Sequence, residues 1–68
     1  MKLKNLIKEL RSENKMTQDE LAKLCKVSRQ TIISLENGKY NPSIFLARKI
    51  AKTFGVLIED VFIFYEEQ

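Results

Sequence analysis

The chain has 68 residues, of which 44% are hydrophobic and 31% charged, and these values fit one small globular domain over residues 1–68. It contains one cysteine and no histidine, which excludes an internal disulfide and the usual metal and catalytic clusters, so an enzyme is not expected. The net charge is +3, but all 12 basic residues lie in residues 1–52, whereas the charged residues in 53–68 are all acidic. This distribution favours a polyanionic partner.

Residues 1–15 are predicted to form a short lead and a first helix. Apolar residues from Leu3 to Leu10 recur at helical spacing with charged residues between them, and Asn14-Lys15 interrupts the pattern. Residues 1–4 alternate apolar and basic side chains, which is also typical of a β-strand.

Residues 17–37 have the pattern of two short helices joined by a tight turn. Thr17 and Glu20 form a T-x-x-E capping box at the start of the first helix, and Ser28 is a suitable cap for the second. Only residues 26–28 separate the two helical patterns, and an Asn-Gly pair ends the second one. This segment is therefore predicted to be a helix-turn-helix.

Each helix of this pair is predicted to bury one face. The inner positions are expected at Leu21, Ala22, Leu24 and Cys25 in the first helix, and at Val27, Ile32 and Leu35 in the turn and the second helix. Cys25 is accordingly interpreted as a buried structural residue and not as a redox or metal sensor.

The outer face of the second helix carries side chains that can contact DNA bases. They are Ser28, Arg29, Gln30, Ile33 and Ser34. In the major groove, arginine can bind the O6/N7 edge of guanine, glutamine can bind adenine, and isoleucine can contact a thymine methyl group. The alternative for Arg29 is a phosphate contact without base recognition.

The sequence SRQTIISLENGKYNPS, residues 28–43, resembles the Cro/CI-type family of helix-turn-helix regulators. The similarity continues through residue 62, and the family's spacing of conserved residue types is matched by Gln18, Ala22, Ile32 and Leu35. The resemblance implies an all-α, five-helix, lambda-repressor-like fold. Lys26 departs from the pattern, because many members have glycine at the turn, and it is expected to adopt a positive φ.

The resemblance also implies roles for individual side chains. Arg11 is expected to form an ion pair with Glu36. Contacts with DNA phosphates are expected from Arg11, Thr17, Gln18, Asn37, Lys39, Tyr40 and Asn41. The free N–H groups at the start of the helix at Gln18 favour a phosphate there. A capping role for Thr17 can coexist with this contact, and for Arg11 and Lys39 a solvated surface position is the alternative.

Residues 44–54 are predicted to form the next helix, capped by Ser43 and stopped by Gly55. Its core positions are expected at Ala47, Ile50, Ala51 and Phe54. Phe45 lies on the other face, where the family usually has a polar residue. It is expected to contact Tyr40 or a partner, or else to be partly buried against the preceding loop.

Residues 57–68 are predicted to take part in dimerisation. Leu57 to Phe62 fits a last short helix, and the following run is β-prone and too apolar to remain in water. The resemblance implies a terminal strand that pairs with residues 1–4, and the homodimer surface is expected at Phe62, Phe64 and Tyr65. Lys2 and Lys4 are expected to lie opposite Glu66 and Glu67, with a frayed tail as the alternative.

These features predict a prokaryotic or phage protein that binds double-stranded DNA. It is expected to be a cytoplasmic transcriptional regulator, a repressor bound to a palindromic operator as a homodimer, without a metal, a cofactor or a small-molecule ligand. The alternatives are an antitoxin that regulates its own operon and, in a different class, a protein-interaction adaptor that does not bind DNA. No apolar run approaches the ~18 residues of a membrane span, and no signal peptide is expected.

Overall fold

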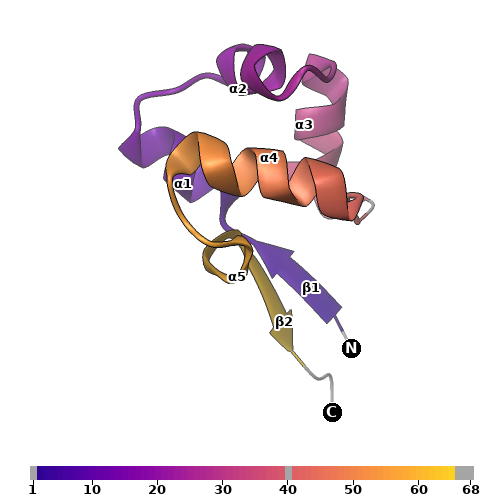
Figure 1. The fold of residues 1–68 in the computed structure, drawn as a ribbon. Helices are drawn as coiled ribbons and strands as arrows, with labels where there is room; N and C mark the ends of the chain where they lie inside the picture. Colours follow the sequence, from indigo (N-terminus) through magenta and orange to yellow (C-terminus); the bar gives the residue numbers. More distant parts are fainter. Residues whose placement is uncertain (1, 40, 66–68) are drawn as a thin grey trace.

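The computed structural model describes residues 2–39 and 41–65, with the side chains of residues 4–39 and 41–64. Along the chain, five helices follow the first of two short strands and precede the second, and the two strands lie side by side at one end of the molecule (Figure 1). In chain order the elements are β1 (Lys2–Asn5), α1 (Ile7–Glu13), α2 (Gln18–Cys25), α3 (Arg29–Glu36), α4 (Ile44–Phe54), α5 (Ile58–Val61) and β2 (Phe62–Tyr65). The predicted five-helix fold with a small terminal sheet is therefore confirmed.

The helices begin where the sequence provides capping side chains. The Thr17 hydroxyl accepts a bond from the Glu20 N–H at 3.0 Å, and the Glu20 carboxylate accepts one from the Thr17 N–H at 2.9 Å, which confirms the capping box of α2. The bond from the Thr17 N–H is the main cause that holds the pKa of the exposed Glu20 carboxyl below its ordinary value, and the Thr17 hydroxyl lowers this pKa further. Ser43 caps α4 in the same way, by accepting a bond from the Leu46 N–H at 3.1 Å.

The turn between α2 and α3 requires a left-handed residue. Lys26 has a φ of 58°, and the N–H of Val27 reaches back to the Ala22 carbonyl at 3.0 Å. The prediction of a positive φ at this non-glycine position is confirmed. Lys15, before α2, has a φ of 52° and was not foreseen. Both lysines occupy a conformation that glycine or asparagine adopts at lower cost.

The core lies between the helices, and its residues come from every helix and from β2. Its fully or nearly fully buried members are Ile7, Leu21, Ala22, Cys25, Ile32, Leu35, Ala47, Ile50, Ala51, Val61 and Phe62. Leu24, expected in this set, is 60% exposed, because α2 buries only the face formed by Leu21, Ala22 and Cys25. Phe45 is 78% exposed, so its expected burial against the loop is also wrong. No helix in the described ranges is both long and apolar enough to cross a membrane.

The terminal strands form an antiparallel pair next to α5, at one end of the molecule (Figure 1). Their register places Lys4 opposite Ile63 and Asn5 opposite Phe62. The expected position of Lys4 opposite an acidic residue is therefore wrong, and Glu66 and Glu67 lie outside the described residues. Phe62, expected on a dimer surface, is only 3% exposed and belongs to the core of the protomer.

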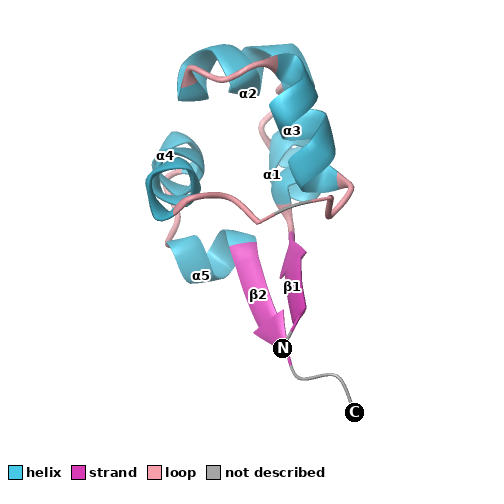
Figure 2. Ribbon diagram, turned by 90° about the vertical axis from the view of Figure 1, so that its right-hand side faces the viewer, coloured by secondary structure: helices cyan, strands magenta, loops and turns pink. Residues whose placement is uncertain are grey.

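The arrangement of the helices leaves α3 with one free side. Figure 2 shows α3 and α4 on opposite sides of the helical body, with α2 crossing one end and α5 with the strands at the other. Because the apolar residues of α3 point into this body, its remaining residues form an outer surface away from α4.

Candidate nucleic-acid interface

The outer face of α3 combines exposed polar groups with one aliphatic side chain. Arg29 and Gln30 are exposed at its first turn, and Ile33 and Ser34 are half-buried one turn later. The Gln30 amide approaches the Ser34 hydroxyl at 3.4 Å, which is too long to hold either side chain firmly. The four side chains share one face because they follow the i, i+1, i+4, i+5 pattern of a helix. The predicted base-contact residues, apart from Ser28, are thus brought together.

Ser28 serves first as the cap of α3. Its hydroxyl oxygen accepts a bond from the Thr31 N–H at 3.1 Å and lies 2.9 Å from the Thr31 hydroxyl. These bonds hold the hydroxyl against the helix start, where a capping residue typically adds about 1 kcal/mol of stability. A base contact from Ser28 would have to share this oxygen with the cap.

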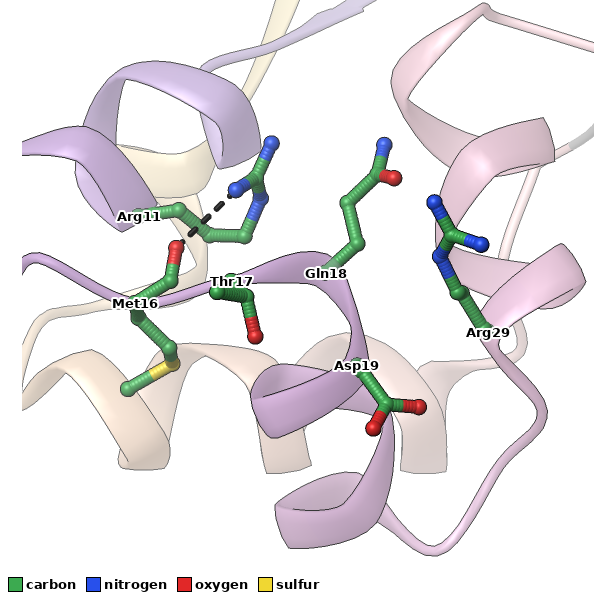
Figure 3. Close-up of a pocket in the computed structure, with 6 residues that line it drawn as sticks. All are labelled: Arg11, Met16, Thr17, Gln18, Asp19 and Arg29. Atoms are coloured by element: carbon green, nitrogen blue, oxygen red, sulfur yellow. Dashed lines mark hydrogen bonds between the residues drawn. The ribbon is translucent and has the colours of Figure 1, made fainter.

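The start of α2 lines an open hollow that also borders α3. Its lining residues are Arg11, Met16, Thr17, Gln18, Asp19 and Arg29 (Figure 3). The side chains of Gln18 and Arg29 face each other across it from different helices. The free N–H groups of the first turn of α2 carry a partial positive charge, and the Arg29 guanidinium on the other side of the hollow is a cation. Both groups can attract a phosphate. Asp19 opposes such a ligand, although its carboxylate lies 3.4 Å from the Lys23 ammonium group.

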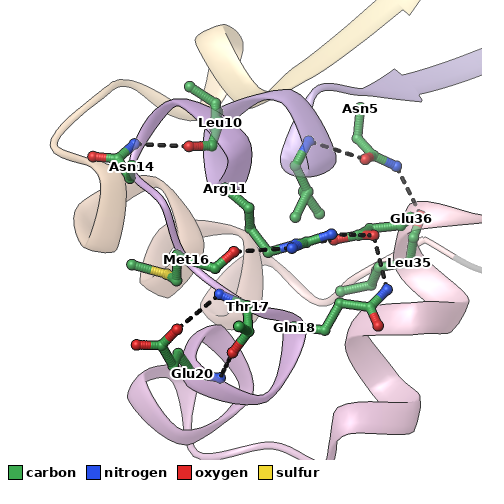
Figure 4. Close-up of polar contacts among 11 residues, drawn as sticks. Asn5, Leu10, Arg11, Asn14, Met16, Thr17, Gln18, Glu20, Leu35 and Glu36 are labelled. Carbon is green, nitrogen blue, oxygen red and sulfur yellow. Dashed lines mark hydrogen bonds and ion pairs between the residues drawn. The ribbon is translucent and has the colours of Figure 1, made fainter.

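A hydrogen-bonded network behind this hollow joins α1, α2 and α3 (Figure 4). The Nε and Nη2 groups of Arg11 donate to the two carboxylate oxygens of Glu36, at 2.6 Å and 3.1 Å, and Nη1 donates to the Met16 carbonyl at 2.9 Å. The Gln18 amide donates to the same carboxylate at 3.1 Å. The predicted Arg11–Glu36 ion pair is confirmed.

This network changes the interpretation of Arg11. Its side chain is 14% exposed and that of Glu36 only 6%, so both charges are largely removed from water. The guanidinium faces Glu36 and the Met16 carbonyl instead of solvent, a geometry that favours a structural role for Arg11 over the expected phosphate contact. Gln18 combines the two roles, since it lines the hollow and contacts Glu36.

The loop after α3 presents the remaining predicted phosphate contacts. Asn37, Lys39 and Asn41 are all exposed, and Tyr40 lies outside the described residues. The Lys39 N–H donates to the Ser34 carbonyl at 2.9 Å, which ties the start of the loop to α3. Neither Lys39 nor Arg29 has a carboxylate partner among the described residues, so both cations are available to a ligand.

Asn5, which the sequence does not single out, lies next to the end of α3. Its amide donates a hydrogen bond to the carbonyl of Leu35 at 2.8 Å. No motif or periodicity marks this residue, because the bond depends on how the chain ends return to the helices.

Cys25 is buried beneath α4, and this burial raises the pKa of its thiol, as expected for a structural cysteine.

Comparison with known proteins identifies a helix-turn-helix protein over most of the chain. A family model described as helix-turn-helix matches residues 7–61. An uncharacterised HTH-type transcriptional regulator of Methanocaldococcus jannaschii is 54% identical over 97% of this chain and 100% of its own length. An uncharacterised HTH-type transcriptional regulator of Archaeoglobus fulgidus is 56% identical over 97% of this chain and 93% of its own length.

A solved structure extends the similarity to three dimensions. The restriction-modification controller protein C.AhdI of Aeromonas hydrophila superposes with a TM-score of 0.74 at 26% identity, over 79% of this chain and 82% of that protein. The matched family model, the two relatives and this structure agree with the helix-turn-helix formed by α2 and α3. The chain therefore belongs to the Cro/CI-type family of helix-turn-helix regulators.

Proposed function

We propose that this protein is a sequence-specific DNA-binding transcriptional regulator, which binds a palindromic operator as a homodimer and represses by occupying a promoter. The observation that carries the proposal is the outer face of α3, where Arg29, Gln30, Ile33 and Ser34 form one surface of groove-reading chemistry. Buried Ile32 and Leu35 hold the opposite side of the same helix in the core.

The proposed complex places α3 in the major groove. Arg29 and Gln30 stand at its first turn, the end of a recognition helix that approaches the base edges most closely. Lys39 and the first turn of α2, near Gln18, then lie on the two flanks of the helix and bind phosphates of the backbone. Phosphate contacts fix the orientation of the protein, and the α3 side chains select the sequence.

The homodimer is assigned to the terminal sheet. A sheet of two strands has two free edges and is marginal on its own, so a second copy would complete it. Phe64 is 61% exposed and Ile63 is 40% exposed, which leaves apolar surface for a partner in the part of β2 beyond Phe62. Tyr65 is the other residue expected on this surface, and its side chain lies outside the described ones.

A selection of bound sites from a random DNA pool tests the proposal as a whole. We expect two inverted half-sites whose centres are ~34 Å apart, or a multiple of this, because a two-fold dimer presents its recognition helices to one side of the duplex. Enrichment of a single unpaired half-site would contradict the homodimer. No enrichment, together with no mobility shift on any DNA, would favour a protein-interaction adaptor.

The dimer surface is tested by Phe64→Lys. A lysine at this exposed position should leave the protomer folded but place a charge at the apolar contact. We therefore expect the affinity of one copy for the other, and the affinity for the operator, each to fall about tenfold or more. Sedimentation velocity and operator titration measure the two effects. Phe45→Lys is the matched control, because Phe45 is equally aromatic and 78% exposed but lies on α4. If Phe64→Lys sediments as the wild-type dimer does, the interface lies elsewhere.

A further inference from the structure

Asn5 links the terminal sheet to the recognition helix. It is the last residue of β1, and its Nδ2 group donates to the Leu35 carbonyl oxygen at 2.8 Å, while its Oδ1 atom accepts a bond from the Ile7 N–H at 3.2 Å (Figure 4). Among the backbone groups of residues 2–39 and 41–65 and the side chains of residues 4–39 and 41–64, no other hydrogen bond joins either strand to α3. One side chain of β1 thus contacts both the start of α1 and the end of α3.

The bond to Leu35 has the chemistry of a helix terminus. Carbonyl groups of the last helical turn lack partners within the helix, and a carbonyl oxygen can accept two hydrogen bonds. The Leu35 oxygen accepts one from the Gly38 N–H at 3.0 Å and the other from Asn5. The bond from Asn5 therefore connects the end of α3 to β1 in a defined direction.

We propose that Asn5 is a positioning residue that sets the orientation of α3 relative to the terminal sheet. This inference rests on the homodimer proposed above, in which the sheet is the contact between the two copies. Asn5 then determines how far apart, and at what relative angle, the two recognition helices meet the DNA. Asn5 therefore affects the preferred spacing between the half-sites and not the base preference within each half-site.

The variant Asn5→Asp separates the two bonds of this side chain. The new carboxylate keeps an acceptor for the Ile7 N–H but places an oxygen where the amide donated to Leu35, so the bond to α3 is replaced by repulsion between two oxygen atoms. Asn14→Asp is the matched control. Its amide also donates to a carbonyl at 2.8 Å, that of Leu10, but this bond is exposed and lies at the end of α1.

The readout is binding to operators whose half-sites are separated by spacers differing in length by one base pair. We expect the wild type and Asn14→Asp to share one strong spacing preference. In Asn5→Asp, the affinity ratio between the preferred spacing and its neighbours should fall about fivefold, the size expected for one hydrogen bond. Binding to a single half-site and the sedimentation of the dimer should be unchanged.

An unchanged spacing ratio in a folded Asn5→Asp protein would overturn the inference and leave the DNA-binding proposal intact. If circular dichroism shows that this variant is unfolded, Asn5→Ser gives the decision by the same ratio, because its hydroxyl is too short to reach Leu35. A wild-type protein that sediments as a monomer and selects no paired half-sites would instead overturn the homodimer, and the spacing role with it.

Discussion

Replacing Arg29 with alanine should remove discrimination at one symmetric pair of operator positions. An arginine that binds the O6/N7 edge of guanine contributes roughly 1–3 kcal/mol of discrimination, which is about a 5- to 150-fold loss of affinity for the preferred operator. Binding to scrambled DNA should remain nearly intact, because an arginine directed at a base edge makes no phosphate contact that all sequences share. Titration of the operator, single-base variants and scrambled DNA measures these effects.

Lys39→Ala is the matched control for Arg29. It removes one exposed cation from the loop after α3, so it should weaken binding to all sequences alike and lower the dependence of log affinity on log salt concentration by about one. An Arg29→Ala protein that behaves like the Lys39 variant, with equal losses on operator and scrambled DNA, would make Arg29 a phosphate contact.

Replacing Glu36 with alanine should cause the largest loss of stability. It leaves the Arg11 guanidinium, 14% exposed, without its carboxylate partner, and breaking a buried ion pair from one side typically costs about 3–5 kcal/mol. In a domain of this size, each 1 kcal/mol lowers the melting temperature by about 4–8 °C. Thermal and denaturant unfolding should therefore show a decrease of more than about 12 °C.

Two comparisons test whether the loss arises from the unpaired charge. The Asp19–Lys23 pair is 3.4 Å long with side chains 59% and 79% exposed, so Lys23→Ala should change stability by less than about 1 kcal/mol. Combining Glu36→Leu with Arg11→Met removes both charges and should recover most of the stability. If the double variant is as unstable as Glu36→Ala, packing and not charge explains the effect.

Local signals in the sequence account for most of the fold. Capping residues lie next to the helices they start, so Thr17, Ser28 and Ser43 could be assigned without knowledge of tertiary structure. Leu24 could not, because a helix of two turns offers several plausible apolar faces and only packing selects one. The strand pair was predictable but its register was not, since register depends on which side chains the core accepts, here Phe62.

The candidate site was predictable where it follows the period of one helix. The outer positions of α3 are determined once its inner residues are known, so Arg29 and Gln30 were identified correctly as exposed groups on the predicted face. The Arg11–Glu36 pair came from resemblance to a family, because 25 residues separate the partners. The Asn5–Leu35 bond spans 30 residues and has no sequence signal, so only the tertiary structure could show it.

Different residues of α3 hold the helix in place and face outward, and this separation has an evolutionary consequence. Ile32, Leu35 and Glu36 connect the helix to the rest of the molecule, while the exposed Arg29 and Gln30 make no long-range hydrogen bond among the described residues. Substitutions at exposed helix positions usually change stability by less than about 0.5 kcal/mol. Under the proposed function, copies of this protein could therefore acquire new operators after gene duplication by changing one side chain at a time, with each intermediate remaining folded.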